Sequence, residues 1–315
     1  MVRKTITFLF PFYLIFVLLT SCDIIGKNRK KPASTGQPYE VVLEGDTDSI
    51  VTKMLTEDVT GLPQPEPLCR LIQVKKGKTQ GSYLLVRTRI IVNIGERDFS
   101  VRLSHDENAA PQNIIRITAR STQQLQEKLN GERLRQIVNE VELKHLADII
   151  SCNPSKQNKE MQDEIKKIFG IDMKIPVSMN ASKKAKDFIW ISNNASTGMQ
   201  NLLVFKVKSE ERRMKNSNAV SADDKAQIDS ILRTNMPGET DSMYMEIPVL
   251  SERGLWEMKG DAMGGPYVMH RIHKSTSQAE IQQGYDLYII GFVYAPEMKK
   301  KILIKQLEAA ISTIK

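Results

Sequence analysis

Cysteine and histidine are scarce in this chain of 315 residues, which contains three of the former and four of the latter. Three cysteines are too few for a scaffold built on disulfides. A zinc site needs several ligands at short fixed spacings, and the histidines show no such pattern. They are His105, His145, His270 and His273. The last two are three positions apart on an expected strand and face opposite sides. We therefore predict no metal site and structural roles for the histidines.

Catalytic signatures are also missing. The sequence contains no G-x-S-x-G elbow, no P-loop and no H-E-x-x-H motif. Neither Cys69 nor Cys152 has a neighbouring base that would make it a nucleophile. Acidic residues are plentiful, so a carboxylate pair of the kind that glycosidases use stays open as an alternative. The sequence favours a protein that is not an enzyme and takes no cofactor.

The N-terminus has the layout of a secretory signal peptide over residues 1–21. Arg3 and Lys4 precede an apolar run from Ile6 to Leu19, which is interrupted at Thr7 and Pro11. The run is too short to span a bilayer comfortably, since a transmembrane helix needs about 20 apolar residues. Export from the cytoplasm is the prediction that follows.

The run ends in Leu19-Thr20-Ser21-Cys22, which resembles the lipobox of bacterial lipoproteins. This resemblance implies cleavage before Cys22, a diacylglyceryl thioether on its sulfur and an acylated (palmitate-bearing) new N-terminus. The bilayer would then be a partner through acylated Cys22, since more than one acyl chain gives stable anchoring. The alternatives are a plain signal peptide and an uncleaved anchor with an incidental cysteine.

Residues 22–38 are basic and then rich in Pro, Ser, Thr and Gly, so they predict a flexible basic tether. Its cations either rest on anionic head groups or are simply solvated. No acidic run follows Cys22. Since such a run commonly accompanies surface display in lipoproteins that this N-terminus resembles, we expect the outer membrane and its periplasmic side.

The formal net charge of +8 raises nucleic acid as a partner. Export argues against it, and the basic residues alternate with acidic ones along the expected helices. We predict no nucleic-acid binding; another envelope protein or an anionic polymer are the partners considered. Cys69 and Cys152 either pair or stay reduced, and two buried free thiols are favoured.

Helices interspersed with strands predict an α+β fold with mostly antiparallel strands. We expect two sheet-and-helix lobes, residues 39–152 and 153–315. Helices are expected around 134–149, from Met161 to Gly170, from Ser221 and over the last residues. The nearly continuous apolar run Tyr285–Tyr294 predicts a strand buried on both faces.

The pattern M-x-I-P-V occurs at 173–177 and at 245–249, each time as an expected strand after a helix. Related α/β units would produce this echo, and so would chance. A distant relationship between the two lobes is kept as one interpretation of the chain.

The stretch from Arg253 to Arg271 gathers aromatic and charged residues around Gly264-Gly265, where we expect a tight turn between two strands. One interpretation is a binding surface on a rigid hairpin. The candidate residues are Arg253, Trp256, Glu257, Tyr267, His270 and Arg271. The other interpretation, which we favour, is a hairpin whose Trp256 and Tyr267 complete the core.

The lipobox, the M-x-I-P-V element, the stretch R-G-L-W-E-M-K-G-D and the apolar strand before the last helix together resemble a family of uncharacterised envelope lipoproteins of Bacteroidetes. The resemblance supplies no active-site residues. The function predicted from the sequence is a membrane-anchored binding or scaffolding module of the cell envelope, with a glycan or peptidoglycan hydrolase as the alternative.

Overall fold

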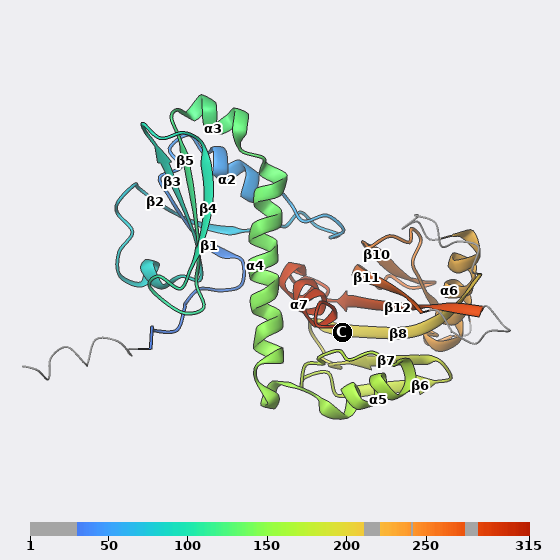
Figure 1. Cartoon of the computed structure of the whole chain (residues 1–315). Helices are drawn as coiled ribbons and strands as arrows, with labels where there is room; N and C mark the ends of the chain where they lie inside the picture. The colour runs from blue at the N-terminus through green and yellow to red at the C-terminus, as the bar shows by residue number, and fades with distance from the viewer. Residues whose placement is uncertain (1–29, 211–220, 241, 275–282) are drawn as a thin grey trace, which may run out of the picture.

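The computed structural model describes residues 30–210, 221–240, 242–274 and 283–315. They form two sheet-and-helix lobes on either side of a long helix, α4 (Gly131–Ser151), as Figure 1 shows. The fold is α+β with two lobes, which confirms the fold class expected from the sequence.

The first lobe is built on a five-stranded sheet with the order β2-β1-β3-β5-β4. Its strands are β1 (Glu40–Glu44), β2 (Arg70–Val74), β3 (Thr88–Ile94), β4 (Ser100–His105) and β5 (Asn113–Ala119). All of them are parallel except β4, which pairs antiparallel with β5 at the edge. The strands expected from the sequence are mostly antiparallel, and this sheet is the mostly parallel part of the fold. The carboxyl ends of four strands consequently lie along one edge of the sheet.

Helices cover one face of this sheet. Short helix α2 (Ile50–Leu55) follows β1 and carries the chain back for the parallel strand β2. It packs with α4, whose N-terminus is capped by the side chain of Asn130. The core between helices and sheet includes Val41, Leu43, Val51, Leu55, Ile90, Val92, Ile115, Ile117, Leu134 and Val138. A further helix, α3 (Thr122–Lys128), follows β5 at the carboxyl edge.

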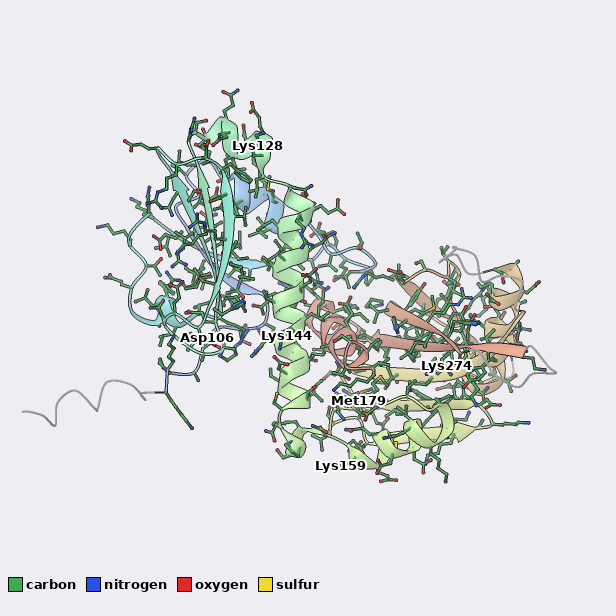
Figure 2. All side chains as sticks on the ribbon, in the orientation of Figure 1. Asp106, Lys128, Lys144, Lys159, Met179 and Lys274 are labelled. Carbon is green, nitrogen blue, oxygen red and sulfur yellow. The ribbon has the colours of Figure 1, made fainter. Side chains whose placement is uncertain are left out.

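The chain enters the first lobe at the opposite edge. Thr35 lies beside Val86, just before β3, and Ala33 lies beside Ala110, just before β5. The backbone N–H of Thr35 donates to the carbonyl of Leu85 at 2.9 Å. The last residues of the expected flexible tether are therefore held against the lobe by backbone hydrogen bonds. Figure 2 shows the two ends, with Lys128 of α3 at one and Asp106 near the entering chain at the other.

The second lobe has a seven-stranded antiparallel sheet with the order β6-β7-β8-β12-β11-β10-β9. Its strands are β6 (Ala181–Ala185), β7 (Phe188–Ser192), β8 (Met199–Glu210), β9 (Tyr244–Glu246), β10 (Arg253–Lys259), β11 (Gly264–Lys274) and β12 (Gln283–Tyr294). The two sheets differ in strand order and direction, so the fold gives no sign that the lobes arose by duplication.

Helices cover both faces of the second sheet. Helices α5 (Lys159–Phe169) and α7 (Lys301–Ile311) pack on one face, and α6 (Ala222–Asn235) packs on the other. Three of the expected local signals are confirmed. Gly170 ends α5 in a left-handed conformation, Ser221 and Asp224 form a capping box on α6, and β12 is the buried central strand.

The strand expected over 173–177 is wrong. This segment is extended, but it forms only an isolated bridge between Gln157 and Pro176. Its apolar side chains Met173 and Ile175 are nevertheless fully buried against the second sheet. The apolar pattern of this segment therefore reflects its burial and not hydrogen-bonded pairing with a neighbouring strand. The second copy of the motif contributes only the short edge strand β9.

Helix α7 joins the cores of both lobes. Its Ile304, Leu307 and Ile311 belong to the core of the second lobe, whereas Ala309 belongs to that of the first. Figure 1 shows α7 beside α4, between the two sheets. A short 3-10 helix, η2 (Pro154–Lys156), links α4 to the second lobe.

Candidate functional site

The aromatic residues of the expected hairpin surface are buried. The side chain of Trp256 is 3% exposed and that of Tyr267 is fully buried, both in the core beneath α6. The indole N–H of Trp256 donates to the carbonyl of Val293 at 3.1 Å, and the hydroxyl of Tyr267 donates to that of Val249 at 2.8 Å. Both aromatic groups thus have satisfied polar atoms within the core.

The remaining residues of that expected surface have different partners and different exposure to solvent. Arg253 forms an ion pair with Glu308 of α7, and Arg271 binds buried Asp286 with its Nη2 at 2.5 Å. Only Glu257 and His270 are well exposed. The six candidates therefore do not share one open face.

Gly264 and Gly265 lie in β11 and do not form the turn that was expected there. The turn follows β10 at Gly260, which has a φ of +83°. Gly265 pairs with Trp256, and a Cβ on it would lie 2.1 Å from the carbonyl oxygen of Val293. The missing side chain lets the Trp256 indole cross to β12, so close packing explains this glycine.

Cys22 lies outside the described residues, which begin at position 30. Cys69 and Cys152 are both free, but only Cys69 is buried. The expectation of two buried thiols is wrong for Cys152, because it follows the last residue of α4 at an exposed helix end. Burial raises the pKa of the Cys69 thiol to about 12.

Within the described ranges, no helix meets the length and apolarity of a membrane span. The same part of the chain contains no group of three or more His, Cys, Asp or Glu residues placed to hold a metal ion. Burial and the nearby Arg87 lower the pKa of His145 to about 4.

A pocket of about 340 Å³ opens at the carboxyl edge of the first sheet. It is lined by Lys76, which follows β2, by Asn93, Ile94, Gly95, Glu96 and Arg97 around the end of β3, and by Thr118 of β5. Ligand sites of open sheets with parallel strands occur at this edge. The first sheet therefore offers a candidate site that sequence analysis missed.

Gly45 shapes this pocket at the end of β1. It has a φ of +81°, and a Cβ on it would lie 2.5 Å from the carbonyl oxygen of Val92 and 3.6 Å from the Cβ of Lys76. The bare backbone lets the turn after β2 approach the end of β3, where Nζ of Lys76 lies 3.5 Å from the carbonyl oxygen of Ile94. Lys76 thus crosses the end of β1 to reach the pocket.

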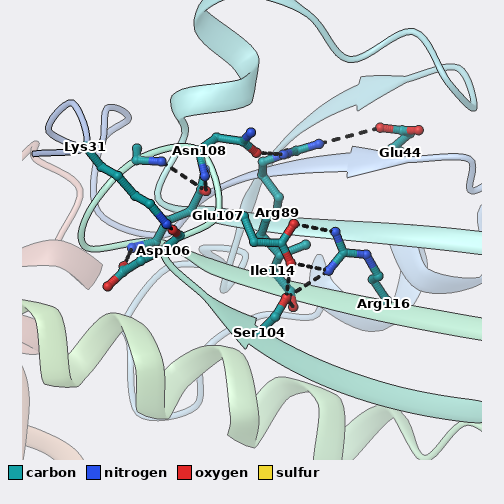
Figure 3. A network of polar contacts seen from close by, with 11 residues as sticks. Lys31, Glu44, Arg89, Ser104, Asp106, Glu107, Asn108, Ile114 and Arg116 are labelled. Atoms are coloured by element: carbon teal, nitrogen blue, oxygen red, sulfur yellow. Dashed lines mark hydrogen bonds and ion pairs between the residues drawn. The ribbon is translucent and has the colours of Figure 1, made fainter. Parts of the chain in front are cut away.

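Figure 3 shows an ion-pair network of the first sheet. Its arginines, Arg89 and Arg116, alternate along β3 and β5 with residues of the core under the helices, so the network lies on the opposite face. Arg116 binds both carboxylate oxygens of Glu107, at 2.6 and 2.7 Å, and Ser104 donates to the same group. These hydrogen bonds lower the pKa of Glu107 to about 2. Beside this pair, Arg89 lies between Asn108 at 2.9 Å and Glu44 at 3.8 Å. The carboxylates of this face are therefore already engaged by arginines.

Few sequence signals mark the pocket. The run Lys75-Lys76-Gly77-Lys78 and the pair Glu96-Arg97 follow two strands, as loops at a ligand site do. They point to a shared site only once β2, β3 and β5 are known to be parallel, because antiparallel strands place successive ends at opposite edges.

Two family models match the chain. The first lobe matches a Domain of unknown function (DUF8532) over residues 34–151, and the second matches another Domain of unknown function (DUF4837) over residues 157–313. No curated protein and no solved structure matches. The matches show similarity to uncharacterised domains and leave the activity open.

Proposed function

We propose that the chain is the precursor of a lipid-anchored lipoprotein of the bacterial cell envelope and that its two lobes form a binding module without catalytic activity. The observation that carries this proposal is the order of a basic start, a short apolar run and Leu19-Thr20-Ser21-Cys22. The resemblance to Bacteroidetes envelope lipoproteins supports the same assignment. The proposed location is the outer membrane, facing the periplasm.

The geometry of the first lobe supports a tethered binding module. Lys30, where the described chain begins, lies eight positions after Cys22. Such a segment spans at most about 29 Å when fully extended. It leads to the amino ends of β3 and β5, whereas the pocket lies at their carboxyl ends. An anchor at Cys22 would therefore leave the pocket on the side of the lobe away from the attachment point.

The hydrolase alternative requires two close carboxylates in a cleft, at least one of them with a raised pKa. Within the described residues, the resolved pKa shifts of carboxyl groups are downward, at Glu107 and Asp172. No observation therefore favours this alternative over a binding module.

The test compares the native chain with Cys22→Ala after expression in a bacterial host. We expect the native protein to start at Cys22, to carry the mass of its acyl chains and to sediment with membranes. The Cys22→Ala form should lack the acyl mass and leave the membrane fraction. A matched control is Cys152→Ala, which removes an exposed cysteine elsewhere and should behave as the native chain does. A native chain with another N-terminus or without acyl mass would overturn the proposal.

A further inference from the structure

We propose that the pocket at the carboxyl edge of the first sheet binds an oxyanion, a phosphate or a carboxylate, that is part of a small ligand. This inference rests on the proposed function, because it names the class of ligand that the binding module takes. Three observations support it: the position of the pocket, the two cations Lys76 and Arg97 that form no ion pair within the described residues, and the side-chain amide of Asn93.

The pocket lies where the sheet order changes direction. The chain leaves the carboxyl end of β1 for β2 on one side, and it leaves the end of the neighbouring strand β3 for β4 on the other side. Loops that leave in opposite directions open a crevice at the carboxyl ends of the strands, and ligands of open sheets bind in such crevices. Arg97 comes from the loop after β3, and Lys76, which follows β2, reaches the same crevice across the end of β1.

Two cations of the pocket lack a carboxylate partner. No ion pair within the described ranges includes Lys76 or Arg97. Two further acidic groups, which follow or end strands at this edge of the sheet, have partners of their own. Glu44 accepts from the backbone N–H of Gly77 at 2.7 Å, and Asp98 pairs with Arg120 at 2.8 Å. An anionic ligand would supply the missing partner for both cations.

Glu96 also lines the pocket, so two cations face one carboxylate there. Its side chain is exposed and has room to turn into solvent. Two cations and one carboxylate suit a ligand with one or two negative charges. A large polyanion would be repelled by the carboxylate of Glu96.

A neutral donor completes the set. Asn93 is half-buried in the pocket wall, and no hydrogen bond engages its side-chain amide in the described structure. An arginine fork, a lysine ammonium and an amide N–H group are the donors that bind carboxylate and phosphate oxygens. Thr118 is a poorer donor because its hydroxyl already bonds to the carbonyl of Asp98 at 3.1 Å.

The size of the pocket restricts the ligand. Its volume of about 340 Å³ is near the lower end of the range of roughly 300–1,000 Å³ that is typical of small-molecule sites. An inorganic oxyanion alone would fill a minor part of this space. We therefore infer that the oxyanion belongs to a small ligand whose remaining atoms contact Ile94 and the backbone of Gly95.

The test titrates the full mature chain, in detergent, with inorganic phosphate and separately with acetate at constant ionic strength in chloride. Amide NMR shifts report the binding. We expect saturable shifts at Asn93, Gly95, Arg97 and Thr118 with at least one of the two probes. Lys76→Ala and Arg97→Ala should each weaken this binding about tenfold, since each removes a charge-assisted hydrogen bond. Lys128→Ala, which removes an exposed cation on α3, is the matched control and should bind as the native chain does.

Saturation by phosphate alone supports a phosphate-bearing ligand, and saturation by acetate alone supports a carboxylate. The absence of saturable shifts with either probe overturns the proposal. The proposal is also overturned if Lys128→Ala weakens the binding as much as Arg97→Ala does. The Cys22→Ala form separates this inference from the proposed function, because it should lose the membrane but keep the oxyanion site.

Discussion

The carboxylate of Glu66 accepts a hydrogen bond from the backbone N–H of Lys300 at 2.6 Å, although 234 positions separate the two residues. The second oxygen of Glu66 accepts from the backbone N–H of Lys301 at 3.2 Å. Helix α7 has no side-chain cap of its own at Lys300. A loop of the first lobe therefore caps a helix of the second and places a negative charge at its N-terminus.

We predict that Glu66→Ala lowers the free energy of unfolding by about 0.5–2 kcal/mol, as the loss of a helix cap does. Glu66→Gln keeps an acceptor oxygen but loses the charge, so its effect should be smaller. Urea denaturation measures both changes. Glu127→Ala, at an exposed position of α3, is the control and should stay close to the native value. Equal stability of Glu66→Ala and Glu127→Ala would show that the cap contributes nothing to folding.

A second prediction concerns Gly265. A methyl group there would clash with the carbonyl of Val293 and displace the Trp256 indole. Gly265→Ala should therefore cost about 1–3 kcal/mol of stability, as overpacking of a core does. Gly95→Ala is the matched control, because its Cβ would meet nothing within 4 Å. Thermal unfolding of the two variants makes the comparison, and matching midpoints would contradict the packing argument.

Local patterns predicted much of the second lobe. Gly170 ends α5, Ser221 begins α6, and the apolar run of β12 is buried at the centre of the sheet. These features depend on residues close together in the sequence, such as caps and hydrophobic periodicity. The same reasoning failed where an apolar segment is buried without pairing, as at Met173.

The direction of the strands in the first lobe could not be read from the sequence. Parallel pairing depends on a crossover whose helix here, α2, has only six residues. The candidate site was missed for the same reason, since Lys76, Asn93 and Thr118 come from three separate segments. The pair Gly264-Gly265 predicts a turn because such pairs are typical of turns. Here Gly265 is required by the close approach of β12.

The thiols offer a third prediction. In Cys22→Ala protein at pH 8, Ellman's reagent should titrate Cys152 rapidly and leave Cys69 unmodified, because the thiolate is the reactive form. Burial raises the pKa of Cys69 to about 12 and also blocks access to it. Unfolding in guanidinium should bring the count from one thiol to two. Modification of two thiols in the folded protein would mean that Cys69 is accessible.

The last prediction concerns pH. Burial and Arg87 lower the pKa of His145 to about 4 in the folded chain, whereas an unfolded histidine has a pKa of about 6.5. Between these values the unfolded state binds a proton that the folded state does not, so stability should fall as the pH drops from about 6.5 to 4. The expected contribution is on the order of 1–3 kcal/mol, because one pKa unit corresponds to about 1.4 kcal/mol.

Other groups also titrate in this range, so the test compares slopes and not absolute stabilities. The pH dependence of urea unfolding should be shallower in His145→Gln than in the native chain. His105→Gln, at the exposed end of β4, is the control and should keep the native slope. An NMR titration of the His145 ring supplies the direct measurement. A midpoint near 6.5 in the folded protein would mean that neither burial nor Arg87 disfavours the charged form of the imidazole.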